Sequence, residues 1–470
     1  MNTVRNPEPD RALQRSALIV ATLTSFMGPF MISSVNVALP KIQADLKMDA
    51  VELGWIATSY LLAMAIGLIP AGKIADISGR KKVFIWGLAV YTAGSFAAAF
   101  AGSPALLIGL RVLQGIGAAM FVTTGMAILT SIFPPNKRGR AIGIYVSAVY
   151  IGLSAGPFFG GLMTNYLGWR SIFVIMLPLG IFSLATTIHY LKGEWRGDPG
   201  QRFDIGGCVL YGSSILALVY GATRLPDPLG VVLLLAGILL FVVFFRYQLK
   251  ARFPVFDVSL FVVNKPFTFS SLAALLNYST TFSVTFLMSL YLQYIKGLDP
   301  KTAGTILMAQ PVMMAFLSPL TGKLSDRVEP RLLATAGMAI TVIGVFLFSR
   351  IGPDTGVSLI IANLIFMGTG FALFSSPNMT AIMGTVQPKH YGLASGTVST
   401  MRLLGQMASM AIATVVLALI VGREMITPDK YDLFLRSVHT VFSISTGLCL
   451  VGVYFSWFRG SVLEPNNSRV

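Results

Sequence analysis

Polar and charged side chains that could bind a ligand lie inside long apolar stretches of this sequence. Arg111 and Gln114 fall within the apolar stretch 107–121, and Asn36 and Arg402 fall within two others. Arginine supplies a permanent positive charge, and an amide both donates and accepts hydrogen bonds. Such groups are costly to bury in apolar segments, so they usually face a protein interior or a water-filled cavity. We therefore expect them either to contact a ligand or to join helices.

The sequence lacks the residue sets that catalysis or metal binding requires. It has two cysteines and three histidines in 470 residues, and it offers no paired acids, Ser/His set or metal-ligand cluster. A nucleotide-binding G-x-x-x-x-G-K-[ST] loop is also absent. Cys208 and Cys449 lie far apart in sequence, which argues against a disulfide framework. We expect no enzyme activity, no catalytic residues, no metal and no cofactor.

The apolar stretches indicate a membrane protein. The chain is 54% hydrophobic and only 11% charged, whereas about a quarter of the residues in soluble domains are charged. Apolar runs of about 20 residues, each long enough to cross roughly 30 Å of hydrocarbon, recur along the chain. We predict an all-α polytopic membrane protein with fourteen transmembrane helices. The predicted ranges are 16–40, 51–72, 82–101, 105–131, 139–166, 169–191, 204–222, 229–249, 266–292, 302–325, 331–350, 357–383, 391–421 and 437–459.

The distribution of basic residues predicts the orientation. The net charge is +16, and most of the 35 Lys and Arg residues fall on the side that holds both ends of the chain. Cytoplasmic loops are enriched in Lys and Arg, so we expect both termini in the cytoplasm and the protein in the cell membrane. Topology thus explains the charge without a nucleic-acid partner. We also expect a monomer.

An internal repeat divides the chain into two related parts. GKIAD at 72–76 returns as GKLSD at 322–326, and several glycines recur 253 residues later. Internal repeats in membrane proteins commonly place a binding site between the two halves. The matched glycines are Gly115 with Gly368, Gly117 with Gly370, and Gly152 with Gly405. The predicted parts are a tail at 1–15, a six-helix bundle at 16–191, a linker with two extra transmembrane helices at 192–265, a second six-helix bundle at 266–459 and a tail at 460–470.

A glycine-rich loop, GKIADISGRKK, follows the second predicted helix. Its first glycine allows close helix approach and its second permits a tight turn. The aspartate between them can accept hydrogen bonds from an arginine or a helix N-terminus across the cytoplasmic interface, which suits a gate. A topological stop without a latch is the alternative. The residues assigned to this gate are Gly72, Asp76, Gly79, Arg80 and, in the repeat, Asp326.

A second glycine-rich motif, GLSAGPFFGGL, lies in the fifth predicted helix. Gly152, Gly156 and Gly160 are four residues apart and form one stripe against which a neighbouring helix can pack closely. Pro157 removes a backbone donor and favours a kink, and Gly161 extends the motif. We expect a tight seam that seals and hinges the bundle. Ordinary helix packing is the alternative.

These motifs resemble those of the major facilitator superfamily. The loop at 72–82 matches G-x-x-x-D-x-x-G-R-[KR]-[KR], and the stretch 152–161 matches the G-x-x-x-G-P-x-x-G-G signature of its exporters. Arg111 with Gln114 matches the fourth-helix R-x-x-Q-G motif. The resemblance covers essentially the whole chain and extends to the fourteen-helix drug:proton antiporters. It implies two six-helix bundles, alternating access and export of amphipathic small molecules by antiport with protons.

The first helix departs from that family pattern. These exporters usually have L-D-x-T-x-x-N-V-A-L-P there, and Met31 takes the place of the aspartate. None of the 19 acidic residues falls in the core of a predicted span. We therefore expect a cavity that favours neutral or anionic amphiphiles over lipophilic cations. Proton coupling and transport without it both stay open, and the candidate coupling carboxylates are Glu52, Asp76 and Asp204.

The candidate cavity residues come from symmetry-related helices. They are Asn36, Arg111, Gln114, Asn277, Tyr278, Gln310, Asn378 and Arg402. For Arg111, a structural clamp on the backbone of the first helix is the open alternative. Two other functions also stay open: export of an endogenous anionic or lipid-like metabolite with atypical or no proton coupling, and a membrane sensor that has lost transport.

Overall fold

Long helices make up nearly all of the described chain. The computed structural model describes residues 11–196, 203–225, 227–251, 254–255, 259–325, 327–386 and 391–460. These residues contain helices and no β-strand, which confirms the predicted all-α class. Asp326 of the predicted gate and the tail residues 1–10 and 461–470 lie outside the described residues.

The first part of the chain forms what we call the N-terminal group. Its helices are α1 (Arg11–Leu46), α2 (Ala50–Ser78), α3 (Arg80–Ala98), α4 (Pro104–Ile132), α5 (Pro135–Tyr166), α6 (Arg170–Val174) and α7 (Met176–Tyr190). Local sequence explains several starts. Asp49 and Glu52 form a reciprocal capping box on α2, and Ser103 caps α4 just before Pro104. The single predicted helix at 169–191 is interrupted at Ile175, between α6 and α7.

The last part forms the C-terminal group. Its helices are α11 (Lys265–Leu290), the π-helical turn η1 (Tyr291–Ile295), α12 (Pro300–Leu307), α13 (Ala309–Leu324), α14 (Pro330–Phe348), α15 (Val357–Gly384), α16 (Tyr391–Ile420), η3 (Pro428–Lys430) and α17 (Tyr431–Phe458). Between the groups lie α8 (Ile205–Thr223), α9 (Pro228–Lys250) and the short α10 (Ser259–Val263). α8 packs against α2 and α16, so the inserted pair touches both groups.

Twelve helical segments in the described residues are long and apolar enough to cross a membrane, with α6–α7 and α12–α13 each taken as one. α3 and α11 are not among them. Three basic residues occupy the first turn of α3, and α11 contains the polar run 277–281. Each of the fourteen predicted segments is helical over most of its described length. Length and apolar character identify only twelve of them as spans, so the predicted count of fourteen is not confirmed.

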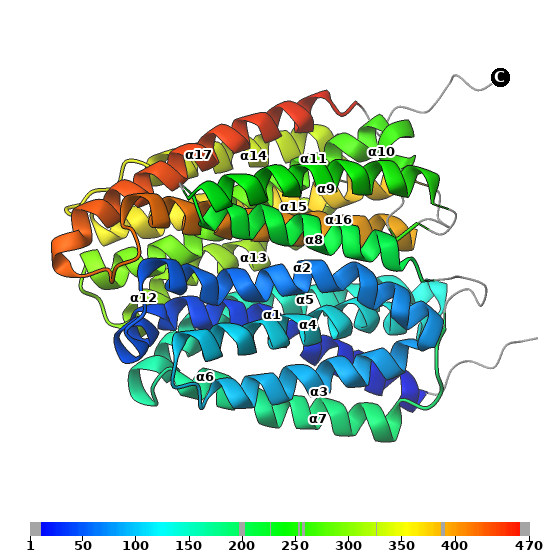
Figure 1. The fold of residues 1–470 in the computed structure, drawn as a ribbon. Helices are drawn as coiled ribbons and strands as arrows, with labels where there is room; N and C mark the ends of the chain where they lie inside the picture. Colours follow the sequence, from blue (N-terminus) through cyan, green and yellow to red (C-terminus); the bar gives the residue numbers. More distant parts are fainter. Residues whose placement is uncertain are drawn as a thin grey trace, which may run out of the picture.

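The two groups repeat one packing arrangement. α1 packs on α5 while α2 and α3 pack on α4; correspondingly, α11 packs on α16 while α13 and α14 pack on α15. Repeat-related glycines make equivalent approaches. A Cβ at Gly152 would lie 2.6 Å from the Phe26 carbonyl oxygen of α1, and one at Gly405 would lie 2.5 Å from the Leu275 carbonyl oxygen of α11. Figure 1 shows the groups as an upper and a lower layer.

The helices run between two ends of the molecule. We call the end where α1 begins and α17 ends the proximal end, and the end with the α1–α2 connection the distal end. In Figure 1 the proximal end lies to the right and the distal end to the left. Between the ends, buried side chains from both groups join into one large apolar cluster.

Candidate functional site

A small cavity of about 80 Å³ lies between the two helix groups. It is lined by residues of α1 and α5 from one group and of α11, α12, α13, α15 and α16 from the other. Apolar side chains such as Leu153, Met314 and Phe371 form much of its wall. A water molecule occupies about 30 Å³, whereas ligand pockets usually span about 300–1,000 Å³. The groups must therefore separate before a drug-sized molecule fits.

Three of the predicted cavity residues line this space: Asn36, Tyr278 and Gln310. Asn36 is only 1% exposed, and its Oδ1 has no hydrogen-bond partner in the described part of the chain. A buried carbonyl oxygen without a partner is costly, so it is available to a ligand or a water molecule. Gln406 also lines the cavity and was missed by sequence analysis. Its position four residues after Arg402, on the same helix face, was the available signal.

The other five predicted cavity residues do not line it. They are Arg111, Gln114, Asn277, Asn378 and Arg402. Asn277 is fully buried in α11, and neither of its amide atoms has a partner within the described residues. Asn378 of α15 accepts a hydrogen bond from Arg459 at 2.7 Å and donates one to the Ser270 carbonyl oxygen at 3.1 Å. It thereby links α15 to α11 and to the end of α17.

Arg111 connects α4 to α2. It is 1% exposed, and its Nε donates a hydrogen bond to the Ile56 carbonyl oxygen at 3.1 Å. A guanidinium NH₂ donates to Gln114 at 2.7 Å, and the group lies over the Tyr60 ring, 4.3 Å from its centroid. Neutral acceptors thus satisfy this cation, since no Asp or Glu among the described residues is buried. Arg111 therefore clamps α4 to the backbone of α2. The open alternative from sequence, a clamp on the backbone of the first helix, named the wrong partner helix.

Gln114 continues this network to α3. Its Nε2 donates to the Ser95 hydroxyl oxygen at 2.8 Å, and that hydroxyl donates to the Tyr91 carbonyl oxygen at 2.7 Å. Arg111 and Gln114 therefore hold three helices together deep in the N-terminal group. Polar groups satisfied in this way rigidify a core, and losing one member leaves the others unpaired.

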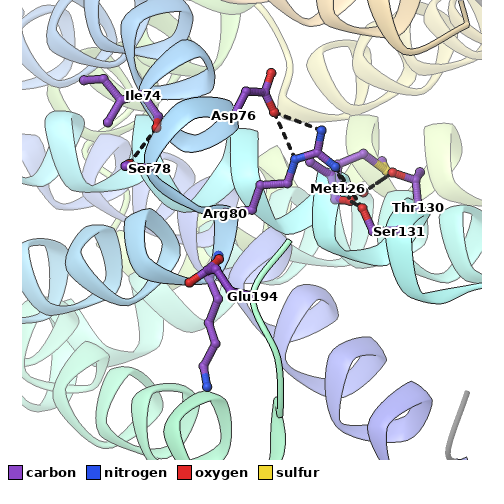
Figure 2. A network of polar contacts seen from close by, with 10 residues as sticks. Ile74, Asp76, Ser78, Arg80, Met126, Thr130, Ser131 and Glu194 are labelled. Carbon is purple, nitrogen blue, oxygen red and sulfur yellow. Dashed lines mark hydrogen bonds and ion pairs between the residues drawn. The ribbon is translucent and has the colours of Figure 1, made fainter. Parts of the chain in front are cut away.

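The glycine-rich stretch 72–82, predicted as a loop, instead forms the end of α2 and the start of α3, with only Gly79 between the two helices. This stretch is joined to α4 (Figure 2). Arg80 makes an ion pair with Asp76 at 2.9 Å and donates to the Ser131 hydroxyl oxygen at 2.8 Å. Within the described residues, Asp76 and Arg80 make no hydrogen bond or ion pair with the C-terminal group. Gly79 has φ of 118°, a conformation that favours glycine. Gly72 lies against α4, where a Cβ would be 3.0 Å from Thr123 Cγ2.

Glu194, which follows α7, caps the N-terminus of α3 (Figure 2). Its carboxylate accepts hydrogen bonds from the backbone N–H of Lys81 at 2.7 Å and of Lys82 at 3.3 Å. Both N–H groups belong to the first turn of α3, where helix N–H groups lack internal partners and attract negative charge. Sequence analysis missed this residue because its partners are backbone atoms more than a hundred positions away.

We expect Glu194→Ala to lower the free energy of unfolding by about 1 kcal/mol, as loss of a helix cap typically does. Glu194→Gln keeps one acceptor oxygen and should lose about half as much. Thermal denaturation of the purified protein in detergent measures both. An unchanged melting temperature for Glu194→Ala would show that the cap contributes nothing.

The glycines of the α5 motif face two different neighbours. Gly156 and Gly160 pack on α1, where added Cβ atoms would lie 2.5 Å from Ser33 Cβ and 2.5 Å from Ser34 Cα. Ser34 also donates a hydrogen bond to the Gly156 carbonyl oxygen at 2.9 Å. This stripe, with Gly152, is therefore a seam inside the N-terminal group.

Gly161 and Pro157 instead meet α12 of the C-terminal group. A Cβ at Gly161 would collide with the Pro300 carbonyl, and one at Gly304 would collide with the Pro157 carbonyl. Asp299 caps α12, and hydrogen bonds from the hydroxyl and backbone N–H groups of Thr302 hold the pKa of this carboxyl below its usual range. One motif thus supplies both an internal seam and a contact between groups.

Hydrogen bonds between the groups cluster at the distal end. Ser289 donates to the Asn36 carbonyl oxygen at 2.8 Å, and the Ala50 N–H donates to the Glu424 carbonyl oxygen at 2.8 Å. We call these contacts, with the Gly161–α12 approach, the distal seal. Its other hydrogen bonds in the described residues are Gln293 to Val37, Tyr294 to Gln43, Lys301 to Tyr166, and Thr58 with Thr414. Closer to the proximal end, the hydroxyls of Tyr150 and Ser375 lie 3.3 Å apart.

The candidate coupling carboxylates lie at helix ends, as expected. Glu52 accepts a hydrogen bond from the Asp49 N–H at 3.0 Å in the capping box of α2. Asp204 caps α8 through the Gly207 N–H at 2.8 Å and also accepts from the side chains of Tyr247 and Gln248. Both groups are therefore engaged as helix caps, whereas Asp76 lies in the last turn of α2 and pairs with Arg80.

The sequence matches the Major Facilitator Superfamily over residues 21–270 and 270–469. It is 28% identical over 445 residues to the riboflavin transporter RibZ of Clostridioides difficile, covering 94% of this chain and 96% of that protein. It is 31% identical over 417 residues to the multidrug resistance protein Stp of Mycobacterium tuberculosis, covering 86% and 77%.

A solved structure has the same fold. It is a bacterial homolog of the human lysosomal transporter Spinster in an inward-facing, unoccupied conformation, with a TM-score of 0.69 and 14% sequence identity. The alignment covers 96% of this chain and 97% of that one. At this identity the likeness concerns the fold alone.

Proposed function

Because the chain belongs to the major facilitator superfamily, we propose that it is a secondary active exporter of amphipathic small molecules that works by alternating access. Family membership makes it a multi-pass membrane transporter rather than an enzyme. The observation that supports alternating access is a cavity between two repeat-related groups whose hydrogen bonds to each other, among the described residues, lie mainly at the distal end. In such transporters, rocking of one repeat against the other exposes a central site to each side in turn.

The proposed topology has fourteen spans, with bundles at 16–191 and 266–459 and an inserted pair within 192–265. The repeat supports α3 and α11 as spans. α3 packs on α4 as α14 packs on α15, and α11 packs on α16 as α1 packs on α5. Since α14 and α1 are apolar enough to span, their counterparts should cross at the same depth.

The proposed orientation places the proximal end in the cytoplasm of a monomer in the cell membrane. The excess of Lys and Arg on that side supports it. The distal seal then faces the outside, and the structure corresponds to a state closed to the exterior. Export requires the distal contacts to break while the proximal ends of the groups approach each other.

The proposed cargo is neutral or anionic rather than cationic. The cavity wall combines apolar side chains with neutral amides such as Asn36 and Gln310, and no buried carboxylate occurs among the described residues. A lipophilic cation would find no countercharge there, and burying an unpaired charge is costly. Relatives named for multidrug resistance and for riboflavin transport support a small organic cargo.

We propose proton antiport, with Asp76 as the coupling carboxylate. Of the three candidates, it alone lies in the stretch assigned to a gate, and among the described residues its only side-chain partner is Arg80, four residues away. Protonation would weaken that ion pair and release Arg80. The absence of an acid in the cavity favours an alternative in which the substrate carries the proton or no coupling exists.

Inside-out proteoliposomes with an acidic lumen test this function. We expect accumulation of dansylglycinamide, a neutral fluorescent amphiphile, to be driven by the pH gradient and to stop when a protonophore is added. Asp76→Asn should reduce gradient-driven accumulation at least tenfold, whereas Asp204→Asn should mainly lower thermal stability. Uptake that ignores the gradient would exclude antiport, and no uptake under any condition would favour the sensor alternative.

A further inference from the structure

Arg402 of α16 differs from the two fully buried arginines, Arg111 and Arg459. Arg111 has two hydrogen-bonded acceptors, and Arg459 donates to Asn378. The half-buried Arg402 makes no hydrogen bond or ion pair with any part of the chain that the structure describes. A guanidinium has five N–H donors in a rigid fork and cannot lose its charge, so its donors need acceptors.

The position of Arg402 relates it to the cavity. Gln406, one helical turn further along α16, lines the cavity together with Tyr278. Residues four apart share a helix face, with a rise of about 6 Å between them. α16 runs from the proximal to the distal end, so Arg402 lies on the proximal side of the cavity. A molecule that entered from the proximal end would meet Arg402 before Gln406.

Each helix group has a phenol within range of the Arg402 charge. The charge of Arg402 acts on the hydroxyls of Tyr145 in α5 and of Tyr278 in α11. Tyr278 also lies close to Tyr150, whose hydroxyl is 3.3 Å from that of Ser375. Arg402 therefore lies at the boundary between the groups. The Tyr145 hydroxyl now donates a long hydrogen bond of 3.5 Å to the Val122 carbonyl oxygen, and it can exchange this partner for an oxyanion.

The part of the chain that the structure describes provides no countercharge for Arg402. No Asp or Glu among the described residues is buried, and none of the described residues forms an ion pair with Arg402. A cation at this depth is costly unless an anion or a set of acceptors accompanies it. The cavity beside it offers apolar walls and neutral amides, which suit the uncharged body of an amphiphile.

We propose that Arg402 is the specificity-determining residue of the cavity and binds the oxyanion of an anionic aromatic amphiphile. The carboxylate or similar group of the cargo lies against the Arg402 guanidinium and the Tyr145 and Tyr278 hydroxyls. Its aromatic body extends past Gln406 into the cavity. The inference rests on the proposed function and names the charge class of its cargo and the residue that selects it.

Three fluorescent probes that share one dansyl group test the proposal: anionic dansylglycine, neutral dansylglycinamide and cationic dansylcadaverine. Their dissociation constants are measured with the purified full chain in nanodiscs of uncharged lipid. We expect the wild type to bind dansylglycine best. Arg402→Gln should raise the dissociation constant of dansylglycine at least tenfold and change that of dansylglycinamide less than twofold. Arg402→Lys should retain part of the preference for the anionic probe. Added salt should weaken the binding of the anionic probe alone, and only in proteins that keep Arg402.

Arg436→Gln is the matched control, because it removes one positive charge from an exposed position in the same group. It should leave all three dissociation constants unchanged. The proposal is overturned if Arg402→Gln binds dansylglycine as the wild type does, or if it weakens the neutral and anionic probes equally, which would mark a purely structural role. Should only the anion preference fail, dansylglycinamide would still bind and be transported. Failure of the proposed function would abolish transport of every probe in the wild type as well.

Should Arg402→Gln fail to fold, Tyr278→Phe replaces it, because this change removes one hydroxyl and keeps the ring. Tyr278→Phe should weaken the binding of dansylglycine more than the binding of dansylglycinamide. Equal binding of both probes by Tyr278→Phe and by the wild type would contradict the proposed oxyanion site.

Discussion

Arg111→Ala should lower the free energy of unfolding by about 3 kcal/mol and reduce transport of every substrate alike. The change removes hydrogen bonds from a charged donor, and it leaves a cavity between α4 and α2 where the side chain was. Gln114 then loses the donor to its carbonyl oxygen, so the network that reaches Ser95 is broken as well. Thermal denaturation in detergent and transport in proteoliposomes measure the two effects.

Two further variants separate a clamp from a ligand-binding role. Gln114→Ala breaks the link to α3 but leaves the bond from Arg111 to the Ile56 carbonyl oxygen, so it should cost less stability than Arg111→Ala. Arg111→Lys keeps the charge but lacks the planar guanidinium that donates to two acceptors at once. Its loss of stability should lie between zero and that of Arg111→Ala. If Arg111→Ala kept the wild-type melting temperature and lost only the binding of anionic probes, Arg111 would contact substrate and the clamp interpretation would be wrong.

Gly304→Leu should abolish transport by forcing the helix groups apart at the distal end. Even a Cβ at this position would collide with the Pro157 carbonyl oxygen of α5, and a leucine adds three more carbon atoms. Backbone on both sides leaves no flexible side chain to move away, so the closed distal seal becomes strained. We expect at least a tenfold loss of transport together with increased access to the distal interface.

A single cysteine at Ser289 measures that access. Ser289 lies buried in the distal seal, so Ser289→Cys, in a chain with Cys208 and Cys449 replaced by alanine, should resist a membrane-impermeant maleimide. Adding Gly304→Leu should increase the labelling rate at least tenfold. Equal labelling with and without Gly304→Leu would show that the glycine contact does not hold the seal closed.

Two other glycine variants serve as matched controls. Gly447 of α17 has nothing within 4 Å of an added Cβ, so Gly447→Leu should change neither transport nor labelling. Gly160→Leu affects the seam between α5 and α1 inside one group. It should lower thermal stability without selectively exposing Ser289. The contrast separates a contact that moves during transport from one that holds a bundle together.

The sequence alone determined the class of protein and its repeat. Long apolar runs can satisfy their backbone in a membrane only as helices, so composition and run length sufficed for an all-α membrane protein. The repeat followed from glycines such as Gly152 and Gly405, because a place where two helix backbones touch tolerates no side chain. Their equivalent contacts with α1 and α11 account for that pattern. The glycine-containing motifs at 72–82 and 152–161 likewise sufficed to indicate the superfamily.

Only the tertiary structure decided which partner each polar residue meets. Arg111, Asn378 and Arg402 had the same signature in sequence, a polar group in an apolar helix. The fold gives the first two neutral acceptors on neighbouring helices, whereas Arg402 has no acceptor among the described residues. Helical periodicity places a residue on a face, but the identity of the facing helix depends on how separate segments pack, and one rotation of a helix changes every partner. For the same physical reason, the sequence could not tell that Gly160 faces its own group while Gly161 faces the other.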